Sequence, residues 1–321
     1  MSISVRQWLQ EHRRKSQFSG RLFYDEALKQ HTYYQIGGVA RVIAIPYTLY
    51  DLAFLTAAIS QSQCRFFILA AGSNVLASDS GFDGLVIKVN KLTSEIGLEP
   101  NGWLKTGSSV KLPTLLSKAA RSGWGGLEFL AGIPGLVGGA VAMNADARFG
   151  DVQQSVQDRL KKVEVAVLKE NDTNQVETKE YSTDKLRFEY RKNLFLQPNE
   201  IILNCYWEIA QTDPKEIKTK IRSLLKKRKE TQPINFPSCG SVFKNVTEKD
   251  GTKISAWQVI DKLGLKGAKI GNAQFSEIHG NFIVNLGSAK AADVKALIEL
   301  AKQRAKNELQ IILEEEVVYL E

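Results

Sequence analysis

Glycine is concentrated in one short segment of this chain. Seven of the 24 glycines lie between Gly123 and Gly139, in the run GWGGLEFLAGIPGLVGG. Such a density indicates backbone that turns sharply or approaches a ligand closely, because glycine has no Cβ to clash. The spacing does not match GxGxxG, and GxxxxGK[ST] occurs nowhere, so Rossmann and P-loop interpretations fail. The segment is either a set of structural turns or a binding loop of another kind.

A second candidate loop is Ala71-Gly72-Ser73-Asn74, which follows an apolar run predicted to be a strand. A loop at the end of a strand is a natural position for a ligand. Backbone N–H groups in such loops bind phosphate oxygens without a basic side chain. Each loop alone is as consistent with a structural turn as with a binding site, and the pair leaves a dinucleotide ligand open.

The apolar pattern predicts a mixed chain of helices and strands. Helices are expected at Leu49–Ser60, Leu112–Arg121, Lys215–Glu230, Ala256–Leu263 and Asp293–Leu309. Strands are expected within His31–Pro46 and at Arg65–Ala70, Gly84–Asn90, Val163–Lys169, Gln175–Tyr181, Ile201–Ile209, Asn281–Leu286 and Ile311–Leu320. Because strands dominate the middle, the pattern favours an α+β fold over a regular βαβ alternation.

Positive charge is also concentrated in one segment. The chain has 43 basic and 35 acidic residues, a net charge of +8, and Lys215–Glu230 contributes eight basic and two acidic residues. This segment is either a solvated surface helix or an electrostatic guide for an anionic ligand. A nucleic-acid partner is less favoured, because no aromatic residue is interleaved with the charges and no nucleic-acid-binding motif accompanies them.

Length and composition limit the remaining possibilities. A chain of 321 residues predicts two or three domains. The apolar runs are too short to span a membrane, and the first residues lack the apolar core of a signal peptide. Three widely spaced cysteines exclude a disulfide scaffold and a zinc cluster. We therefore expect a cytoplasmic protein without a metal site or a membrane partner.

Several motifs together resemble one enzyme family. Two segments closely resemble UDP-N-acetylenolpyruvoylglucosamine reductases, the MurB family: Ala70–Val89 (AAGSNVLASDSGFDGLVIKV) and Gly125–Ala145 (GGLEFLAGIPGLVGGAVAMNA). The motif sequences resemble those of the type II branch of the family. The resemblance continues through YRKNLF, QPINFPSCGSVFKN and SEIHGNFIVNLG, and it ends near LEEEVVYL. The motifs occur in the family's order from about Thr32 to the C-terminus, so the resemblance is specific.

The resemblance implies both a fold and a reaction. The implied fold is a two-lobed FAD-binding domain of the vanillyl-alcohol oxidase (PCMH) type, over 1–79 and 80–212, followed by a smaller α+β substrate-binding domain over 213–321. The last strand of the chain could return to the first lobe. The implied reaction reduces the enolpyruvyl ether of a UDP-sugar, with hydride passing from NADPH through FAD to the alkene, in a cytoplasmic step of peptidoglycan precursor synthesis. Such a site needs a proton donor, a cation for the enolate and a group that orients the carboxylate.

Three residues match the family's catalytic positions. Ser241 matches the proton donor, and Arg191 matches the arginine that holds the enolate carboxylate, which a planar guanidinium suits. Glu316 matches the glutamate that assists the enolate step, with Glu314 as the alternative because three acids are consecutive. On an alternating strand Glu314 and Glu316 would face one way and Glu315 the other.

The remaining site residues follow from the same motifs. FAD is expected at Ala71, Gly72, Ser73, Asn74, Val75, Leu76, Ile133, Pro134, Gly135, Gly138, Gly139, Ala140 and Asn144. Substrate is expected at Tyr190, Arg228, Lys244, Asn245 and His279. Lys244 and Asn245 could instead cap local backbone, and His279 could be a packed, hydrogen-bonded histidine. We expect a monomer whose partner is the small-molecule substrate.

One loop departs from the family pattern. After the GIPG segment the family usually has asparagine-alanine-glycine-alanine-tyrosine-glycine, whereas this chain has Asp146 in place of the glycine and one additional residue before Gly150. The resemblance places this loop close to the flavin. The departure leaves the three catalytic positions intact. The alternatives are a related flavin oxidase with another substrate and a basic binding protein with vestigial flavin motifs.

Overall fold

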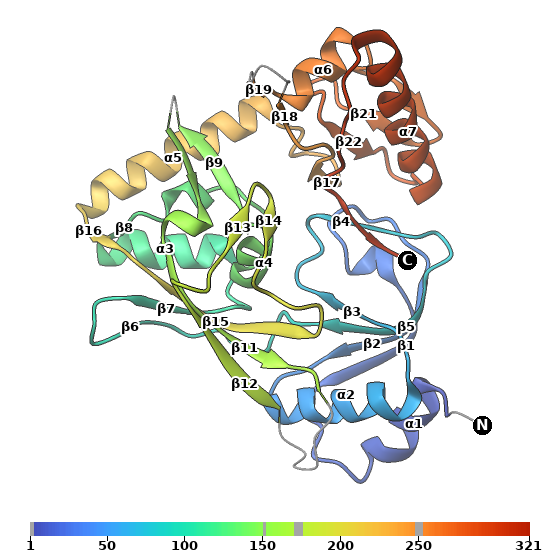
Figure 1. Cartoon of the computed structure of the whole chain (residues 1–321), viewed down its shortest axis with the longest axis vertical. Coiled ribbons are helices and arrows are strands. Elements are labelled where there is room, and N and C mark those ends of the chain that lie inside the picture. The colour runs from blue at the N-terminus through green and yellow to red at the C-terminus, as the bar shows by residue number, and fades with distance from the viewer. Residues whose placement is uncertain (1–2, 150–151, 170–175, 248–252) are drawn as a thin grey trace. The chain divides into compact units, whose positions relative to one another are not determined.

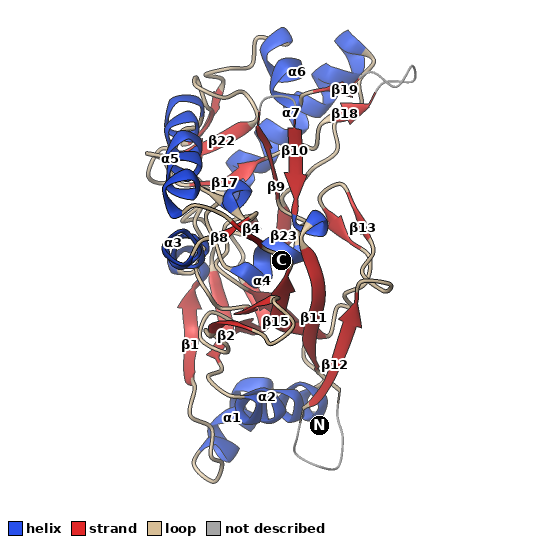
Figure 2. Ribbon diagram, turned by 90° about the vertical axis from the view of Figure 1, so that its left-hand side faces the viewer, coloured by secondary structure: helices blue, strands red, loops and turns tan. Residues whose placement is uncertain are grey.

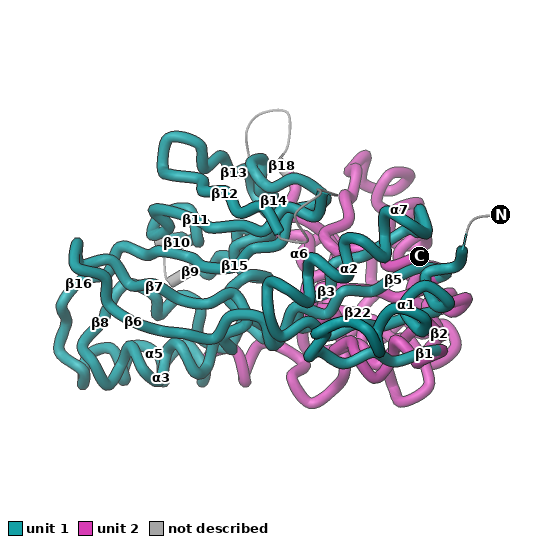
Figure 3. The backbone as a smooth tube through the Cα atoms, turned by 90° about the horizontal axis from the view of Figure 1, so that it is seen from below, with its two compact units in different colours: residues 1–24, 41–71, 83–226 teal, residues 25–40, 72–82, 227–321 magenta. Residues whose placement is uncertain are grey.

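The structure of the protein is a computed structural model that describes residues 3–149, 152–169, 176–247 and 253–321. Helices and strands are mixed along the chain, which confirms the α+β prediction (Figures 1 and 2). The chain folds into two compact units (Figure 3). Unit 1 is Met1–Tyr24, Arg41–Ala71 and Asp83–Lys226, and unit 2 is Asp25–Ala40, Gly72–Phe82 and Lys227–Glu321. The units are interleaved in sequence, and the three consecutive domains stay a prediction.

Unit 1 contains two helices that pack against most of a four-stranded sheet of order β1-β2-β5-β3 (Figure 1). The elements are α1 (Val5–Arg13), β1 (Arg21–Ala27), β2 (Val39–Ile45), α2 (Leu49–Ser62), β3 (Phe66–Leu69) and β5 (Phe82–Lys88). Thr48 and Asp51 form a capping box that starts α2. Helix α1 is not among the predicted helices. It forms because Ser4 caps it and because Val5 and Leu9, one turn apart, are buried.

A second sheet of unit 1 is antiparallel throughout, with the order β12-β11-β15-β7-β6. The strands are β6 (Ile96–Leu98), β7 (Leu104–Gly107), β11 (Leu160–Val167), β12 (Glu177–Ser182) and β15 (Glu200–Trp207). Helices α3 (Leu112–Ser122) and α4 (Val137–Ala142) share a core with it that includes Phe129 and Trp207. The predicted strands at Val163–Lys169, Gln175–Tyr181 and Ile201–Ile209 are confirmed with shifts at their ends, except that Gln175 lies outside the described residues.

The glycine-rich segment is not one loop. It contains β8 (Trp124–Gly125), which pairs with β16 (Ala210–Gln211), then the 3-10 turn η2 (Glu128–Leu130) and the start of α4. Four of its glycines, at 123, 126, 132 and 135, have φ between +74° and +135°, a region that side chains other than glycine rarely adopt. The glycines are therefore required by sharp turns. Two hairpins follow, β9 (Asp146–Phe149) with β10 (Val152–Ser155) and β13 (Phe188–Glu189) with β14 (Lys192–Asn193).

Unit 2 has its own core, formed by a four-stranded antiparallel sheet and helices α6 and α7. The sheet has the order β17-β22-β21-β20, with β17 (Ser238–Ser241), β20 (Lys269–Ile270), β21 (Ala273–Phe275) and β22 (Phe282–Asn285). The other elements are α6 (Ala256–Lys262), α7 (Ala291–Leu309), β18 (Val246–Thr247), β19 (Lys253–Ile254), and the parallel pair β4 (Val75–Ala77) and β23 (Val318–Leu320). Asp79 accepts the backbone N–H groups of Ala291 and Ala292 at 2.8 and 2.9 Å, which caps α7.

Short helical turns and the basic helix complete the described chain. The turns are η1 (Leu28–Gln30) and η3 (Val156–Asp158). Helix α5 (Pro214–Thr231) begins as predicted, with Asp213 accepting the N–H of Lys215 at 2.8 Å. No helix in the described ranges combines the length and the apolar character that crossing a membrane requires.

The predicted strand at Ile311–Leu320 is wrong over most of its length, because only Val318–Leu320 is a strand. Residues before it run beside 242–244 and form a single bridge between Glu315 and Phe243. This pairing is too short for a ladder. The expected two-sided alternation of the three acids therefore does not apply.

Candidate active site

The predicted site residues are divided between the two units. Unit 1 holds Ala71, Ile133, Pro134, Gly135, Gly138, Gly139, Ala140, Asn144, Tyr190 and Arg191. Unit 2 holds Gly72, Ser73, Asn74, Val75, Leu76, Arg228, Ser241, Lys244, Asn245, His279 and Glu316. The boundary between the units falls inside the loop Ala71–Asn74.

In unit 1, the start of α4 lies against the ends of two strands. The N–H of Gly138 donates to the carbonyl of Ser108, just after β7, at 2.9 Å. A Cβ built on Gly138 would stand 2.9 Å from the Cβ of Ser108, too close for any side chain. A Cβ on Gly139 would meet only the Cβ of Ala70, after β3, at 3.6 Å. The two glycines therefore allow a close approach of backbone at Gly138 and leave open space at Gly139.

Arg191 lies in a tight turn of the same unit. The turn joins β13 to β14, and Arg191 has φ +58°, a left-handed conformation that costs energy for a side chain of this kind. Its guanidinium Nη2 lies 2.6 Å from Oδ1 of Asp146, with side chains 20% and 10% exposed. The guanidinium also lies over the ring of Tyr190, 5.5 Å from its centroid. In the sequence, Asp146 is noticeable only as a departure from the family pattern.

Two amide side chains hold this turn in place. Asn144 Nδ2 donates to the carbonyl of Glu189 at 3.1 Å, and Asn193 Nδ2 donates to the carbonyl of Ala142 at 2.6 Å. Asn144 is buried and has φ +43°. The backbone on each side of Arg191 is therefore tied to the end of α4. Asn144 was predicted to contact FAD, and in the structure its amide supports the Arg191 turn.

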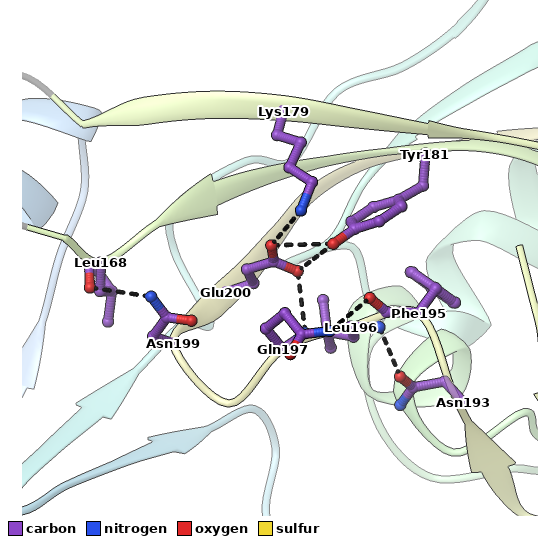
Figure 4. Close-up of polar contacts among 9 residues, drawn as sticks. All are labelled: Leu168, Lys179, Tyr181, Asn193, Phe195, Leu196, Gln197, Asn199 and Glu200. Carbon is purple, nitrogen blue, oxygen red and sulfur yellow. Dashed lines mark hydrogen bonds and ion pairs between the residues drawn. The ribbon is translucent and has the colours of Figure 1, made fainter. Parts of the chain in front are cut away.

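A buried carboxylate supports the loop that follows (Figure 4). Glu200, whose side chain is 2% exposed, accepts the Tyr181 hydroxyl at 2.8 Å and Lys179 Nζ at 2.9 Å. It also accepts the N–H of Gln197 at 3.0 Å. Burial raises the pKa of Glu200, but these hydrogen bonds outweigh burial and leave its pKa below the usual value. The network fixes residues 195–200 directly after the hairpin that carries Arg191.

In unit 2, Ser241 and Glu316 lie on neighbouring segments. The N–H of Glu316 donates to the carbonyl of Val242 at 2.8 Å, so Glu316 is hydrogen-bonded to the residue after Ser241. Ser241 ends β17 and is half-buried, and no residue within the described ranges hydrogen-bonds to its hydroxyl. A Cβ on the preceding Gly240 would meet nothing within 4 Å. The hydroxyl is thus available to a ligand.

A buried asparagine that the motifs did not mark as functional fixes this pairing. Asn281 is 4% exposed, and its Oδ1 accepts the N–H of Phe243 at 2.9 Å while its Nδ2 donates to the Phe243 carbonyl at 2.8 Å. Its own carbonyl accepts the N–H of Val242 at 2.9 Å. Asn281 therefore sets the path of the chain immediately after Ser241. The only sequence signal was its position in SEIHGNFIVNLG.

The three consecutive acids have different surroundings. Glu314 is 71% exposed and pairs with Lys244 at 3.2 Å. Glu315 pairs with Lys302 at 2.9 Å and accepts the Tyr319 hydroxyl. Glu316 is half-buried, and its carbonyl accepts the side-chain amide of Asn74 at 3.0 Å. Of the three, Glu316 is therefore the one whose backbone is tied to a predicted FAD loop.

The cysteine beside Ser241 is not a nucleophile at neutral pH. Cys239 is buried in the core of unit 2, and burial together with the charge of Glu316 raises the pKa of its thiol to about 12. The thiol therefore stays protonated.

The predicted substrate residues of unit 2 are engaged locally. Lys244 forms the ion pair with Glu314, and Asn245 Oδ1 accepts the N–H of Ala256 at 3.1 Å, capping α6. His279 Nδ1 accepts the N–H of Asn281 at 3.3 Å, and its ring packs edge-on against two aromatic rings. Burial lowers the pKa of His279, so it is neutral at pH 7. Their roles in substrate binding stay predictions.

The remaining predicted substrate residues are Tyr190 and Arg228. Tyr190 is 41% exposed beside Arg191. Arg228 lies in the last turn of α5, half-buried, with Nη1 3.4 Å from Oε1 of Gln232. The other basic residues of this helix are mostly exposed.

The residues present fit an FAD. Phosphate oxygens need donors that the protein does not itself use. The N–H and hydroxyl of Ser73 donate to no other residue in the part of the chain that is described, and the space beside Gly139 is open. Gly72 has a left-handed backbone conformation. Its carbonyl accepts the N–H of Tyr33 at 3.0 Å, which fixes the loop.

Comparison with known proteins decides the family. Residues 40–170 match the family described as FAD binding domain, and residues 232–320 match the C-terminal domain of UDP-N-acetylenolpyruvoylglucosamine reductase. The chain is 38% identical over 299 residues to the UDP-N-acetylenolpyruvoylglucosamine reductase of Halalkalibacterium halodurans, which covers 93% of this chain and 94% of the relative. The chain belongs to the UDP-N-acetylenolpyruvoylglucosamine reductase family. The reductase of Geobacter metallireducens is 36% identical over 95% of this chain and 96% of its own length.

A crystal structure from the reductase family agrees with the fold. The enzyme from Thermus caldophilus aligns with a TM-score of 0.74 and 32% identity, over 95% of this chain and 100% of that chain. The chain is thus an FAD-dependent oxidoreductase with an FAD-binding domain and the reductase family's C-terminal domain. The resemblance identified from the sequence motifs is confirmed.

Proposed function

We propose that this reductase converts UDP-N-acetylglucosamine enolpyruvate to UDP-N-acetylmuramate with NADPH, as a cytoplasmic step of peptidoglycan precursor synthesis and therefore of cell-wall biogenesis. The observation that carries the proposal is the pairing in unit 2. The segments that carry Ser241, Glu316 and the predicted FAD loop are joined there by backbone contacts: the N–H of Glu316 donates to the carbonyl of Val242 at 2.8 Å, and the Asn74 amide donates to the carbonyl of Glu316 at 3.0 Å. When bound, FAD supplies hydride transfer from NADPH to the enolpyruvyl double bond.

Ser241 is the proposed proton donor. Proton transfer needs a donor within hydrogen-bond reach of the reacting carbon, and a serine hydroxyl is a weak acid in water. Its acidity in this role depends on neighbours that stabilise the departing negative charge. The proposal is supported by the local structure, since Asn281 and Glu316 fix the chain on the residues directly after Ser241.

Arg191 is the proposed cation for the substrate carboxylate. Negative charge builds on this carboxylate when hydride has been added, and a fixed guanidinium stabilises it without reorganisation. The left-handed turn and its two amide supports are consistent with this role, because strained backbone held by surrounding contacts is typical of functional positions. Glu316 is proposed to assist the same enolate step.

The remaining assignments are part of the same proposal. FAD is assigned to residues 71–76, to residues 133–135 and 138–140, and to Asn144. Substrate is assigned to Tyr190, Arg228, Lys244, Asn245 and His279. The monomeric state and the three-domain layout are included as well.

The decisive experiment follows the flavin in two steps. Purified protein should be yellow, and its visible flavin absorption should be bleached by NADPH under anaerobic conditions. Addition of UDP-N-acetylglucosamine enolpyruvate should then restore the absorption stoichiometrically. Protein that neither contains flavin nor takes up added FAD would contradict the proposal. Rapid recovery with oxygen and none with the enolpyruvyl sugar would instead indicate a flavin oxidase with another substrate.

A further inference from the structure

The ion pair between Arg191 and Asp146 joins two hairpins of unit 1. Asp146 is the first residue of β9 and pairs in register with Ser155 on β10. Its Oδ1 lies 2.6 Å from Arg191 Nη2, and its Oδ2 accepts the side-chain amide of Gln153. The carboxylate is therefore held from both oxygens, on an element distant in sequence from the Arg191 turn.

The pair differs from an ordinary surface salt bridge. Exposed pairs contribute about 0–1 kcal/mol, because water competes for both charges and both side chains lose freedom. Here the two side chains are only 20% and 10% exposed. The contact is a close approach of two opposite charges, and such an attraction is stronger where both side chains are partly removed from water. The pair is thus able to fix the direction of a side chain.

Backbone contacts alone leave the guanidinium unfixed. The hydrogen bonds of Asn144 and Asn193 hold the backbone near Arg191, but they do not restrict rotation of the Arg191 side chain. Immobilising such a side chain on ligand binding costs about 0.5–1.5 kcal/mol. A partner that holds the guanidinium beforehand removes part of that cost. Asp146 is an acidic partner that holds the guanidinium in this way, and a glycine in its place has no side chain to do so.

We propose that Asp146 is a positioning residue that holds the guanidinium of Arg191 ready for the carboxylate of the enolpyruvyl group. This inference rests on the proposed function. It assigns a role to Asp146, which stands where the family pattern usually has glycine. It also implies that this chain depends on a side-chain contact that a glycine at this position cannot make.

The test compares D146N with a matched control, D83N. Asn keeps the shape of Asp146 and removes its charge. Asp83 forms an ion pair with Arg41 at 3.2 Å in the same unit, but its side chain is 83% exposed. The rate at which the enolpyruvyl sugar reoxidises the reduced flavin should fall about tenfold in D146N, within the usual range of coupling between contacting residues. Flavin reduction by NADPH should be unchanged, and D83N should match the wild type in both steps.

Ligand binding gives a second readout that does not depend on turnover. Perturbation of the flavin absorption by UDP-N-acetylglucosamine, which has no carboxylate, should give the same dissociation constant in D146N and wild type. The enolpyruvyl sugar should bind several-fold more weakly to D146N. Tighter binding of the enolpyruvyl sugar would overturn the inference, because it would mean that Asp146 competes with the substrate carboxylate.

A double-mutant cycle tests whether the effect passes through Arg191. In an R191K background, D146N should change the reoxidation rate little, because the guanidinium it positions is absent. D146E should restore part of the activity. Equal losses in both backgrounds, or losses in D146N that follow a lower melting temperature and affect both half-reactions, would overturn the inference. A wild-type protein that never reduces the enolpyruvyl sugar would instead refute the proposed function.

Discussion

The side-chain amide of Asn74 donates a hydrogen bond to the backbone carbonyl of Glu316, at a distance of 3.0 Å. The N–H of Val318 in turn donates to the carbonyl of Asn74 at 3.0 Å, and the parallel pair β4–β23 begins there, with Val318 opposite Val75. A residue of a predicted FAD loop therefore fixes the position of the proposed catalytic glutamate. A change in one of these segments must affect the other.

Asn74→Ala should loosen this connection. The half-buried carbonyl of Glu316 would lose its donor, and the free energy of unfolding should fall by about 1 kcal/mol. Turnover should fall as well, because Glu316 is then less firmly placed. Thermal unfolding and steady-state rates would measure both effects. The control is N272A in the same unit, where an exposed amide donates to Ser288. An N74A variant that behaves like N272A would contradict the prediction.

Ser241→Ala should separate the two half-reactions. Flavin reduction by NADPH should proceed at the wild-type rate, because it does not require the serine. Reduction of the enolpyruvyl sugar should slow by about 10²–10⁴-fold, the usual contribution of a positioned proton donor. Stopped-flow absorbance measures each step. Loss of both steps to the same degree would show that Ser241 has a structural role.

The three cysteines should differ in reactivity. Cys205 and Cys239 are buried, and burial raises the pKa of both thiols, that of Cys239 to about 12. Cys64 is partly accessible, although burial also raises its pKa. A thiol reagent at pH 8 should therefore label at most Cys64, and slowly, in the folded protein. All three should react in denaturant. Fast labelling of Cys239 in the native state would mean that its motif opens readily.

Local sequence patterns predicted the regular elements well. Helices α2, α3 and α7 combine an apolar stripe with nearby start or stop residues, and all of that information lies within the helix and its ends. Helix α1 was not predicted because only two of its residues, Val5 and Leu9, are buried, and the polar and charged residues around them weaken the apolar pattern. The strand expected at Ile311 was wrong because strand formation depends on a partner of sufficient length, which local sequence does not reveal.

The site residues also fall into those that local sequence indicates and those that only the folded chain shows. Motifs predicted catalytic positions at Ser241, Arg191 and Glu316, which stay predictions, and they did not indicate the residues that contact these positions. Asn281 and Asp146 act on chain segments far away in sequence, so their roles depend on the register of hairpins that only the folded chain defines. The sequence showed Asp146 as a departure from a pattern. Its contact with Arg191 became evident only in three dimensions.

Arg228→Glu should weaken substrate capture through charge. Arg228 lies half-buried in the last turn of α5, next to the exposed Lys227, so K227E makes the same change of charge one residue away. R228E should raise the Michaelis constant for the UDP-sugar about tenfold at low salt, and added salt should reduce the difference. K227E should have little effect. Equal effects of the two variants would assign the helix a general rather than a local electrostatic role.

Glu200→Gln tests the network that supports the loop after Arg191 (Figure 4). Hydrogen bonds hold the pKa of Glu200 in the folded protein below its value in the unfolded chain, which is about 4.3. The ionised carboxylate therefore stabilises the folded protein fully at a pH above about 4.3, and this stabilisation is lost as the pH falls through the folded pKa. E200Q should therefore lower the free energy of unfolding by about 2 kcal/mol at pH 7. The difference in unfolding free energy between E200Q and the wild type should become smaller below about pH 4.3.

E180Q, which removes a carboxylate that is 56% exposed, is the control and should change stability by under about 0.5 kcal/mol. Urea unfolding at several pH values measures both variants, and a gap for E200Q that is independent of pH would show that the buried carboxylate is not held in its ionised form.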